Sequence, residues 1–500
     1  MNYNLLEEEW IPVLWKKGNS NRVGIITALT QADKIRQIAA SNPMDRVAIL
    51  RFLLALLYWC QGNSDGANAQ SGGSFPKKWF KKLDDNKHLF NLLGDENRFY
   101  QDHNVDGNAV AVTNLLHDLP SGTNITHFRH VRDFHEGLCL ACCAMGLLRW
   151  PSVASAGKFG KWQQMTACIN GNTPAYSIPT GANLLETLWL NWPSSPPVNG
   201  DAPVWENPIE ESPLGFLKGM TWRSRRILLA PPDTQGNRDF SAGLCCYCGE
   251  PTDRLVKSIL FRPGWPRPSK EPWSDDPQLL RVDIKDNKGK VKKIIPPWPS
   301  PNDPLEDHAA TWRSVLKGIL QYPVVNHSDP THFHNTLIGA SQALYKHVET
   351  LIVNMPGLEL NIIRDLLTEV EWLAQLTWKA TSARTKDWNK RPKDHEVINT
   401  LCSTAAKGHA IRSGLCAVSF LAEKELQKAF EKLTQGLASA DLADTNAQAK
   451  VLENWKEEVG EILRRNVDQV VEFTTTGSPL RRREARQRVN EAILKQCDKL

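Results

Sequence analysis

The sequence predicts an α+β protein of two domains: a large, irregular, mixed domain over residues 1–355, followed by a C-terminal four-helix bundle over residues 356–500. Three observations lead to this fold class. The chain has 500 residues, which is too long for one ordinary hydrophobic core. Before residue 356, Pro and Gly are dense and credible helices are short and separated. After Pro356, apolar residues recur at helical spacing over long stretches.

Helices in the first domain are expected over residues 45–58, 138–148 and 183–190. In the first of these, the apolar residues at helical spacing are Val47, Leu50, Leu54 and Leu57. Proline recurs so often between residues 193 and 215, and between 263 and 304, that only loops and short strands fit there.

Four amphipathic helices joined by short turns are expected after residue 356, and they should pack as an antiparallel bundle. The apolar positions of the first three are Ile362, Leu366, Val370 and Leu373; Leu426, Ala429, Phe430 and Leu433; and Leu452, Trp455, Val459, Ile462, Val470 and Phe473. Thr445 is a candidate N-cap for the third helix, and the fourth runs from about residue 479 to residue 495.

Composition narrows the class of protein. Hydrophobic residues make up 41% of the chain and charged residues 23%, as in soluble globular proteins. The sequence lacks the roughly 18 consecutive apolar residues of a membrane helix. Glu7, Glu8 and Glu9 stand where a signal peptide would be basic, so we expect a cytoplasmic protein. A net charge of +5 excludes a uniformly basic coat for nucleic acid, although it allows local basic patches.

Two C-x-x-C pairs, Cys139 with Cys142 and Cys245 with Cys248, are the most specific chemical feature. This spacing lets both thiolates of a pair reach one metal ion, and two pairs complete a tetrahedral shell of four sulfurs, which suits Zn2+. The ion would clamp two distant segments, and because four thiolates leave no position for an activated water, it would be structural. Buried cysteines, or a single redox pair, are the alternative interpretations.

Signals for catalysis are weak. The sequence contains no P-loop, no G-x-S-x-G and no dinucleotide glycine fingerprint. Histidines between His127 and His135, with Asp133 and Glu136 nearby, leave open a zinc-dependent nuclease, but no helical H-E-x-x-H pattern frames them. Residues 156–161 contain two glycines and two lysines: Gly157, Lys158, Gly160 and Lys161. Glycines allow the backbone to approach a phosphate and lysines supply charge, so this segment is either a phosphate-binding loop or a plain flexible loop.

A set of short motifs lies in order over nearly the whole chain. The motifs are Asn4-Leu5-Leu6, Trp10-Ile11-Pro12-Val13, Leu138-Cys139 with Cys142, Gly171-Asn172-Thr173-Pro174, Gly215-Phe216-Leu217-Lys218-Gly219 with Trp222, and Cys245 with Cys248-Gly249. Each motif alone is weak, but the ordered set is specific, and it resembles the CasA family, the large subunits of type I-E CRISPR Cascade complexes.

The resemblance implies a cytoplasmic subunit of an RNA-guided surveillance complex and no enzyme activity of its own. Its partners would be the other Cascade subunits with their CRISPR RNA, and double-stranded target DNA. It would recognise the protospacer-adjacent motif through minor-groove loops and start strand separation, so that the guide can pair. It would also provide the docking surface for a helicase-nuclease that is recruited after target binding.

The resemblance further implies which residues bind DNA. Gln342 matches the family's wedge glutamine, which unstacks one base step. The family's lysine finger falls at Pro263, so the adjacent Arg262 would supply the cation in the negative groove. The glycine loop, with fewer glycines than is usual in the family, would be Gly157, Lys158, Gly160 and Lys161. A mobile loop of the family matches residues 123–130, with the contact residues Phe128, Arg129 and His130.

Two rival functions make different predictions. A zinc-dependent nuclease that uses the His127–His135 region would cleave DNA as an isolated chain when metal is supplied. A purely structural scaffold would assemble with its partners, and changes at Gly160, Arg262 or Gln342 would leave target binding unaltered.

Overall fold

The computed structural model describes residues 3–62, 73–94, 98–116, 137–154, 156–159, 163–172, 174–193, 197–206, 208–232, 238, 240–285, 289, 291–294, 315–317, 334–342, 348–356, 364, 367, 425, 428–430, 432–437, 439–440 and 444–474. The chain forms two compact units, one of residues 1–295, 324–328 and 332–352, the other of residues 296–323, 329–331 and 353–500. The predicted division into 1–355 and 356–500 stays a proposal, because much of the second range lies outside the described residues.

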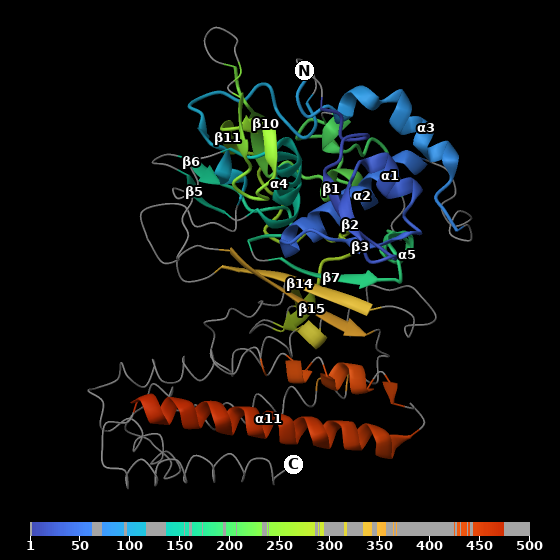
Figure 1. Ribbon diagram of the computed structural model, residues 1–500, viewed down its shortest axis with the longest axis vertical. Coiled ribbons are helices and arrows are strands. Elements are labelled where there is room, and N and C mark those ends of the chain that lie inside the picture. Colours follow the sequence, from blue (N-terminus) through green and yellow to red (C-terminus); the bar gives the residue numbers. More distant parts are fainter. Residues whose placement is uncertain are drawn as a thin grey trace. The chain divides into compact units, whose positions relative to one another are not determined.

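The larger unit mixes short antiparallel strands with helices (Figure 1). Its three-stranded sheets have the orders β2-β1-β3, β4-β11-β8 and β15-β14-β7, and its two-stranded sheets are β9 with β10, β5 with β6, and β12 with β13. The strands are β1 Ile11–Trp15, β2 Ser20–Val23, β3 Ile35–Ile38, β4 Val110–Ala111, β5 Gly157–Phe159, β6 Gln163–Met165, β7 Ala175–Thr180, β8 Arg225–Leu229, β9 Phe240–Leu244, β10 Pro251–Val256, β11 Ser258–Pro263, β12 Val282–Lys285, β13 Val291–Ile294, β14 His334–Gln342 and β15 Val348–Pro356.

Helix α2, Pro43–Gln61, is buried along most of its length. It begins at a well-formed cap: the side chain of Asn42 accepts a hydrogen bond from the backbone N–H of Met44 at 2.8 Å, and Pro43 occupies the first turn, where its missing N–H costs nothing. It ends at Gly62, whose φ of 59° suits glycine. The predicted helix over residues 45–58 is confirmed.

The other predicted helices of this unit are also confirmed. Helix α4, Leu140–Val153, packs against α2, and every one of its residues is buried. Helix α5, Leu184–Leu190, is capped by Asn183, whose side chain accepts a hydrogen bond from the N–H of Glu186 at 2.9 Å. The remaining helical segments are α1 Ile25–Thr30, α3 Lys77–Asp85, η2 Lys87–Phe90, η3 Val112–Leu115, η5 Val204–Glu206 and α6 Phe216–Met220.

Aromatic side chains attach the irregular segments to the core. Trp205 lies in η5, inside the proline-rich stretch where only loops and short strands were predicted. Its ring meets Trp59 of α2 edge-on at a centroid distance of 5.9 Å and Phe52 at 5.7 Å. Aromatic rings bury a large apolar area with little conformational entropy to lose, so one residue of this kind fixes a segment with few backbone hydrogen bonds.

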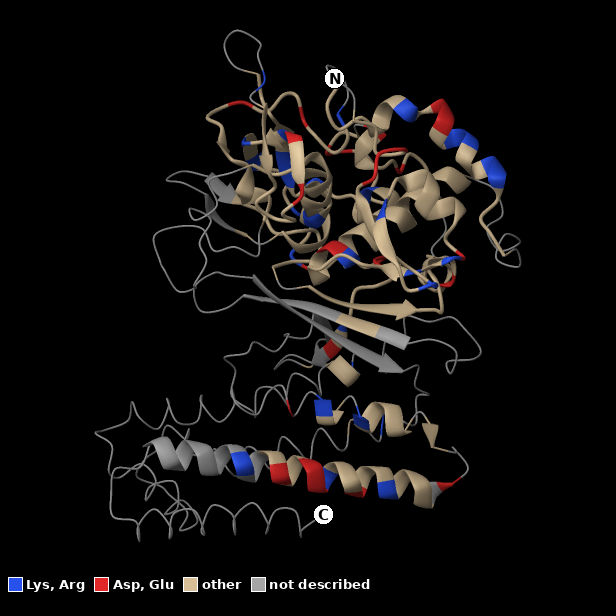
Figure 2. Ribbon diagram, in the orientation of Figure 1, with Lys and Arg blue, Asp and Glu red and all other residues tan. Residues whose placement is uncertain are grey.

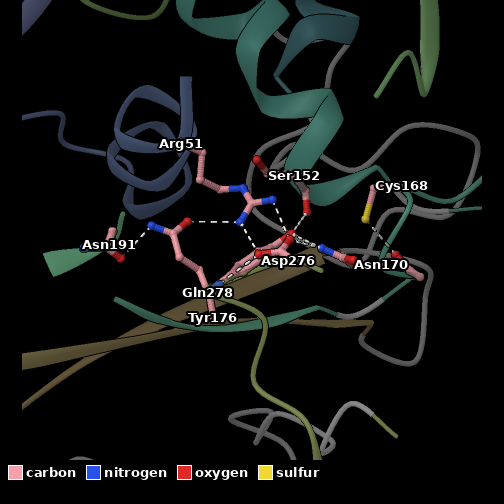
Figure 3. A network of polar contacts seen from close by, with 9 residues as sticks. Arg51, Ser152, Cys168, Asn170, Tyr176, Asn191, Asp276 and Gln278 are labelled. Atoms are coloured by element: carbon pink, nitrogen blue, oxygen red, sulfur yellow. Dashed lines mark hydrogen bonds and ion pairs between the residues drawn. The ribbon is translucent and has the colours of Figure 1, made fainter. Parts of the chain in front are cut away.

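A buried polar network joins α2 to the second proline-rich stretch (Figure 3). Arg51 donates to both carboxylate oxygens of Asp276, at 3.0 and 2.6 Å, and to the side-chain oxygen of Gln278 at 3.0 Å. Asn170 also donates to Asp276, at 2.6 Å. Burial raises the pKa of Asp276, but the charge and hydrogen bonds of Arg51 outweigh it, so the pKa lies below its usual value.

The smaller unit contains helix α11, Thr445–Thr474. The predicted cap at Thr445 is wrong: Asp444 caps this helix, because its carboxylate accepts hydrogen bonds from the N–H groups of Asn446 and Ala447, at 2.9 and 3.1 Å. The buried face of α11 includes Trp455, Val459 and Ile462, as the apolar spacing predicts.

Part of the second predicted bundle helix is also described. Residues 428–430 and 432–437 are helical, with Ala429, Phe430 and Leu433 buried. Lys432 forms an ion pair with Glu458 of α11 at 2.5 Å. The first and fourth predicted helices lie almost entirely outside the described residues, so the four-helix bundle stays a prediction. In the described part of the chain, every helix is too short or too polar to cross a membrane.

Candidate metal centre and nucleic-acid interface

The first cysteine pair lies at the start of α4. Cys139 is the N-cap residue, with extended backbone angles, and Cys142 follows in the first turn. Residues three apart on a helix project from the same side, so both sulfurs can reach one point. Cys143 is also buried, but its sulfur lies 3.8 Å from the carbonyl oxygen of Leu138 and is not one of the gathered ligand atoms.

The second pair lies in the turn between β9 and β10. The N–H of Cys245 donates to the carbonyl of Glu250 at 2.9 Å, and the N–H of Gly249 donates to the carbonyl of Cys245 at 2.9 Å. Gly249 has a φ of 77°, a conformation that favours glycine. The tight turn therefore brings Cys245 and Cys248 together at the end of a hairpin.

Backbone hydrogen bonds hold the two cysteine segments against each other. Leu138 and Val256 exchange hydrogen bonds, at 3.0 and 2.9 Å, and the N–H of Cys246 donates to the carbonyl of Gly137 at 3.1 Å. A side chain at Gly137 would not fit, since an added Cβ would lie 2.6 Å from the carbonyl oxygen of Val256. The N–H of Cys139 points at the sulfur of Cys245, at 3.3 Å.

The four sulfurs of Cys139, Cys142, Cys245 and Cys248 all lie within 4.8 Å of one another, and those of Cys139 and Cys248 are 3.7 Å apart. A tetrahedral site with metal–sulfur bonds of about 2.3 Å has sulfur–sulfur edges of about 3.8 Å. The four cysteines could therefore hold a metal ion. Both cysteine pairs take part, so a lone redox pair does not describe the arrangement.

The electrostatics of the cluster also fit a cation. Hydrogen bonds with the neighbouring sulfurs, Cys139 first, and burial raise the pKa of Cys142 well above its usual value. Hydrogen bonds from Cys139 and Cys142 lower the pKa of Cys245 to about 6. Not all four thiols can ionise at neutral pH unless a positive charge is supplied, and a divalent ion supplies it.

Residues outside the cluster connect it to the helices. Tyr247, inside the second pair, donates its hydroxyl proton to Asp45 of α2 at 3.2 Å and accepts a hydrogen bond from Arg149 of α4 at 2.9 Å. Arg149 and Asp45 form a buried ion pair, with nitrogen–oxygen distances of 2.5 and 2.8 Å. Burial lowers the pKa of Arg22, from β2, but its interactions with Cys248 and Cys142 outweigh burial, so the pKa lies above its usual value. The sequence reasoning missed these supports, because no local pattern signals them.

Most of the predicted DNA-contact side chains lie outside the described residues. These are Phe128, Arg129, His130, Gly160 and Lys161, together with the whole His127–His135 region. Of the glycine loop, Gly157 and Lys158 belong to β5, which pairs with β6 so that Lys158 lies opposite Gln164. Gln342 is the last residue of β14, and its side chain is not among those described.

Arg262 is described, and it lies on β11, the strand that follows the cysteine hairpin. Its guanidinium donates to the carbonyl of Phe261 at 2.9 Å and to the carbonyl of Asn108 at 3.4 Å. It is half-buried and is held by a loop instead of extending freely. Its direct neighbour across the strand pair is Arg226 of β8. The sequence reasoning missed Arg226, because the pairing of distant strands is not visible in the sequence.

Comparison with known proteins gives consistent results. A model of the family described as CRISPR-associated protein Cse1 matches residues 4–465. The CRISPR-associated protein CasA/Cse1 of Thermus thermophilus is 34% identical over 229 residues, which are 43% of this chain and 44% of that protein. The match therefore spans less than half the length of that curated relative.

Solved structures share the fold at low sequence identity. The crystal structure of CasA from Thermus thermophilus matches with a TM-score of 0.68 at 19% identity, covering 100% of both chains. Cse1 from Thermobifida fusca matches with a TM-score of 0.69 at 17% identity, covering 99% of this chain and 98% of that one. A chain of a CRISPR RNA-guided surveillance complex gives 0.66 at 14% identity, with 99% of each chain covered.

Proposed function

The chain belongs to the CRISPR-associated Cse1 family, also called CasA, and from this membership we propose that it is the large subunit of a type I-E Cascade surveillance complex. The observation that carries the proposal is the family match over residues 4–465, nearly the whole chain. In this role the chain assembles in the cytoplasm with the other Cascade subunits and their CRISPR RNA. The match of the fold to a chain of an RNA-guided surveillance complex supports the same assignment.

The subunit recognises the protospacer-adjacent motif of duplex DNA before the guide pairs, while base pairing itself reads the target. The segments that carry Gly157 to Lys161 and Phe128 to His130, together with Arg262 of strand β11, enter or border the minor groove. Gln342, at the end of β14, acts as the wedge that opens the first base step. After target binding, the subunit provides the docking surface for the helicase-nuclease, which carries out the cleavage.

The metal held by the four cysteines is Zn2+, and its role is structural. Four sulfur donors from two C-x-x-C pairs suit zinc, and a shell of four thiolates leaves no position for an activated water. When bound, the ion joins the start of α4 to the β9–β10 hairpin. Strand β11 follows that hairpin directly, so the clamp fixes the position from which Arg262 projects.

Replacing Gln342 by alanine tests the wedge. In the assembled complex, Gln342→Ala should slow opening of a fully paired target about tenfold, because the wedge offsets part of the few kcal/mol that unstacking costs, and about 1.4 kcal/mol of barrier corresponds to tenfold in rate. The rate is measured by fluorescence of a base analogue placed next to the motif. A target with mismatched pairs beside the motif should restore the rate, because opening is then already accomplished.

The matched control is Gln37→Ala, which removes an exposed glutamine from β3 and should leave both rates unchanged. Equal opening rates for Gln342→Ala and the unmodified chain on the fully paired target would contradict the wedge. Metal-dependent DNA cleavage by the isolated chain would instead favour the nuclease that uses the His127–His135 region.

A further inference from the structure

One face of the β8–β11 pair carries two arginines side by side. The antiparallel register places Arg226 directly opposite Arg262. Their neighbours in the strands, Ile227 and Phe261, are also paired and are buried in the core. Side chains alternate between the two faces of a sheet, so both arginines project from the opposite face. Like charges placed directly opposite each other repel, so this pairing needs compensation.

A single carboxylate provides only part of that compensation. Asp102 accepts a hydrogen bond from Nε of Arg226 at 2.7 Å, and it lies 3.6 Å from Nη1 of Arg223. Burial raises the pKa of Asp102, but the hydrogen bonds from Arg226 and the N–H of Asn104 outweigh it, so this carboxylate remains charged. Within the described residues, Arg262 bonds only to main-chain carbonyls. Among the described residues, Arg226 and Arg262 together therefore meet a single carboxylate, that of Asp102.

The loop of residues 102–108 fixes both guanidinium groups. Arg226 donates to the carbonyl of Asn104 at 2.7 Å, and Arg262 donates to that of Asn108 at 3.4 Å. At Gly107, with a φ of 101°, an added Cβ would lie 1.8 Å from Nη2 of Arg262. The positive φ favours glycine at this position, and the missing side chain leaves room for the Arg262 guanidinium against the loop. The arginines are held in place by backbone contacts, so little side-chain entropy remains to be lost on binding an anion.

We propose that Arg226 and Arg262 form a phosphate-binding pair, and that its ligand is the sugar–phosphate backbone of the target duplex beside the motif. The proposal rests on the proposed function and adds Arg226 and the loop of residues 102–108 to the DNA interface. Paired guanidinium groups match phosphate oxygens in geometry and in charge. Figure 2 shows Lys and Arg interspersed with Asp and Glu along the described ribbon. The two opposed arginines of β8 and β11 are therefore a local excess of positive charge.

The salt dependence of target binding tests this pair. The assembled complex is titrated with target duplex at several salt concentrations, with the chain unmodified or carrying Arg226→Gln. The magnitude of the slope of log K against log salt should fall by about 1, as expected for one lost phosphate contact. Binding should weaken by a similar factor whatever the flanking bases, since a phosphate contact reads no sequence. Arg226→Lys keeps the charge and should keep most of the slope.

The matched control is Arg254→Gln on β10. The side chain of Arg254 is 36% exposed and lies 3.9 Å from Asp253, while that of Arg226 is 35% exposed and is paired with Asp102. A slope for Arg226→Gln equal to that of Arg254→Gln would overturn the proposal. A defect in assembly with guide RNA, with the target slope unchanged, would overturn it too, by making RNA the ligand. If the unmodified complex ignores the flanking motif, the proposed function fails instead.

Discussion

Replacement of Cys142 by serine should abolish metal binding and unfold much of the larger unit. The four sulfurs come from two segments that are joined otherwise by few backbone hydrogen bonds. Binding of a structural Zn2+ contributes on the order of 10 kcal/mol to folding, and the net stability of a folded domain is only about 5–15 kcal/mol. The Cys142→Ser variant loses one ligand, and its three remaining crowded thiols have no cation. We therefore expect the variant to lose most of that stability.

The measurement is the metal content of the purified chain, together with its unfolding followed by circular dichroism. The matched control is Cys246→Ser, which changes a cysteine of the same turn that lies outside the sulfur cluster. This variant should keep one equivalent of metal. A Cys142→Ser chain that retains the metal and melts like the unmodified chain would show that the four cysteines are not a structural centre.

Replacement of Asp276 by alanine should lower the free energy of unfolding by about 3–5 kcal/mol, because it leaves the guanidinium of Arg51 buried without a counter-charge. The two side chains are 1% and 0% exposed, so water cannot compensate. The loss is measured by chemical denaturation. As a control, Glu7→Gln breaks the exposed pair with Lys87, whose side chains are 65% and 47% exposed, and should cost at most about 1 kcal/mol.

The pH dependence of stability gives a second measurement of the same ion pair. The pKa of Asp276 is lower in the folded chain than in the unfolded chain, so its contribution is complete above the unfolded pKa of about 4. It is lost as the pH falls from there through the lower folded pKa. The Asp276→Ala variant should lack this component of the acid sensitivity. Equal stability of the variant and the unmodified chain at pH 7 would contradict the assigned role of the pair.

Local features of the fold were predictable from the sequence. Helices α2, α4 and α5 have apolar spacing or capping residues, such as Asn183, that act within a few residues. The two cysteine pairs were predictable because their spacing reflects the geometry of a single turn, and the chemistry of four sulfurs explains why distant pairs meet. At the start of α11, Thr445 was predicted as the cap, but Asp444 caps the helix. Both residue types are good caps and they are adjacent, so the sequence did not decide between them.

Long-range polar pairing was not predictable. Arg51 interrupts the otherwise apolar run of residues 47–60 in α2, and nothing near it in the sequence identifies Asp276, 225 residues away, as its partner. The opposition of Arg226 and Arg262 depends on strand register, which no periodicity reveals. The hydrogen bonds of Tyr247 were not predictable for the same reason, since its partners Asp45 and Arg149 come from two separate helices.

The proposal that this subunit reads duplex DNA is tested most directly by a selection on flanking sequence. The assembled complex, with and without this chain, is allowed to bind a pool of target duplexes whose bases beside the guide-matched region are randomised, and bound DNA is sequenced. We expect a restricted motif to be enriched only when the chain is present. Equal enrichment without the chain, or bound DNA as random as the input pool, would contradict the assignment of motif recognition to this protein.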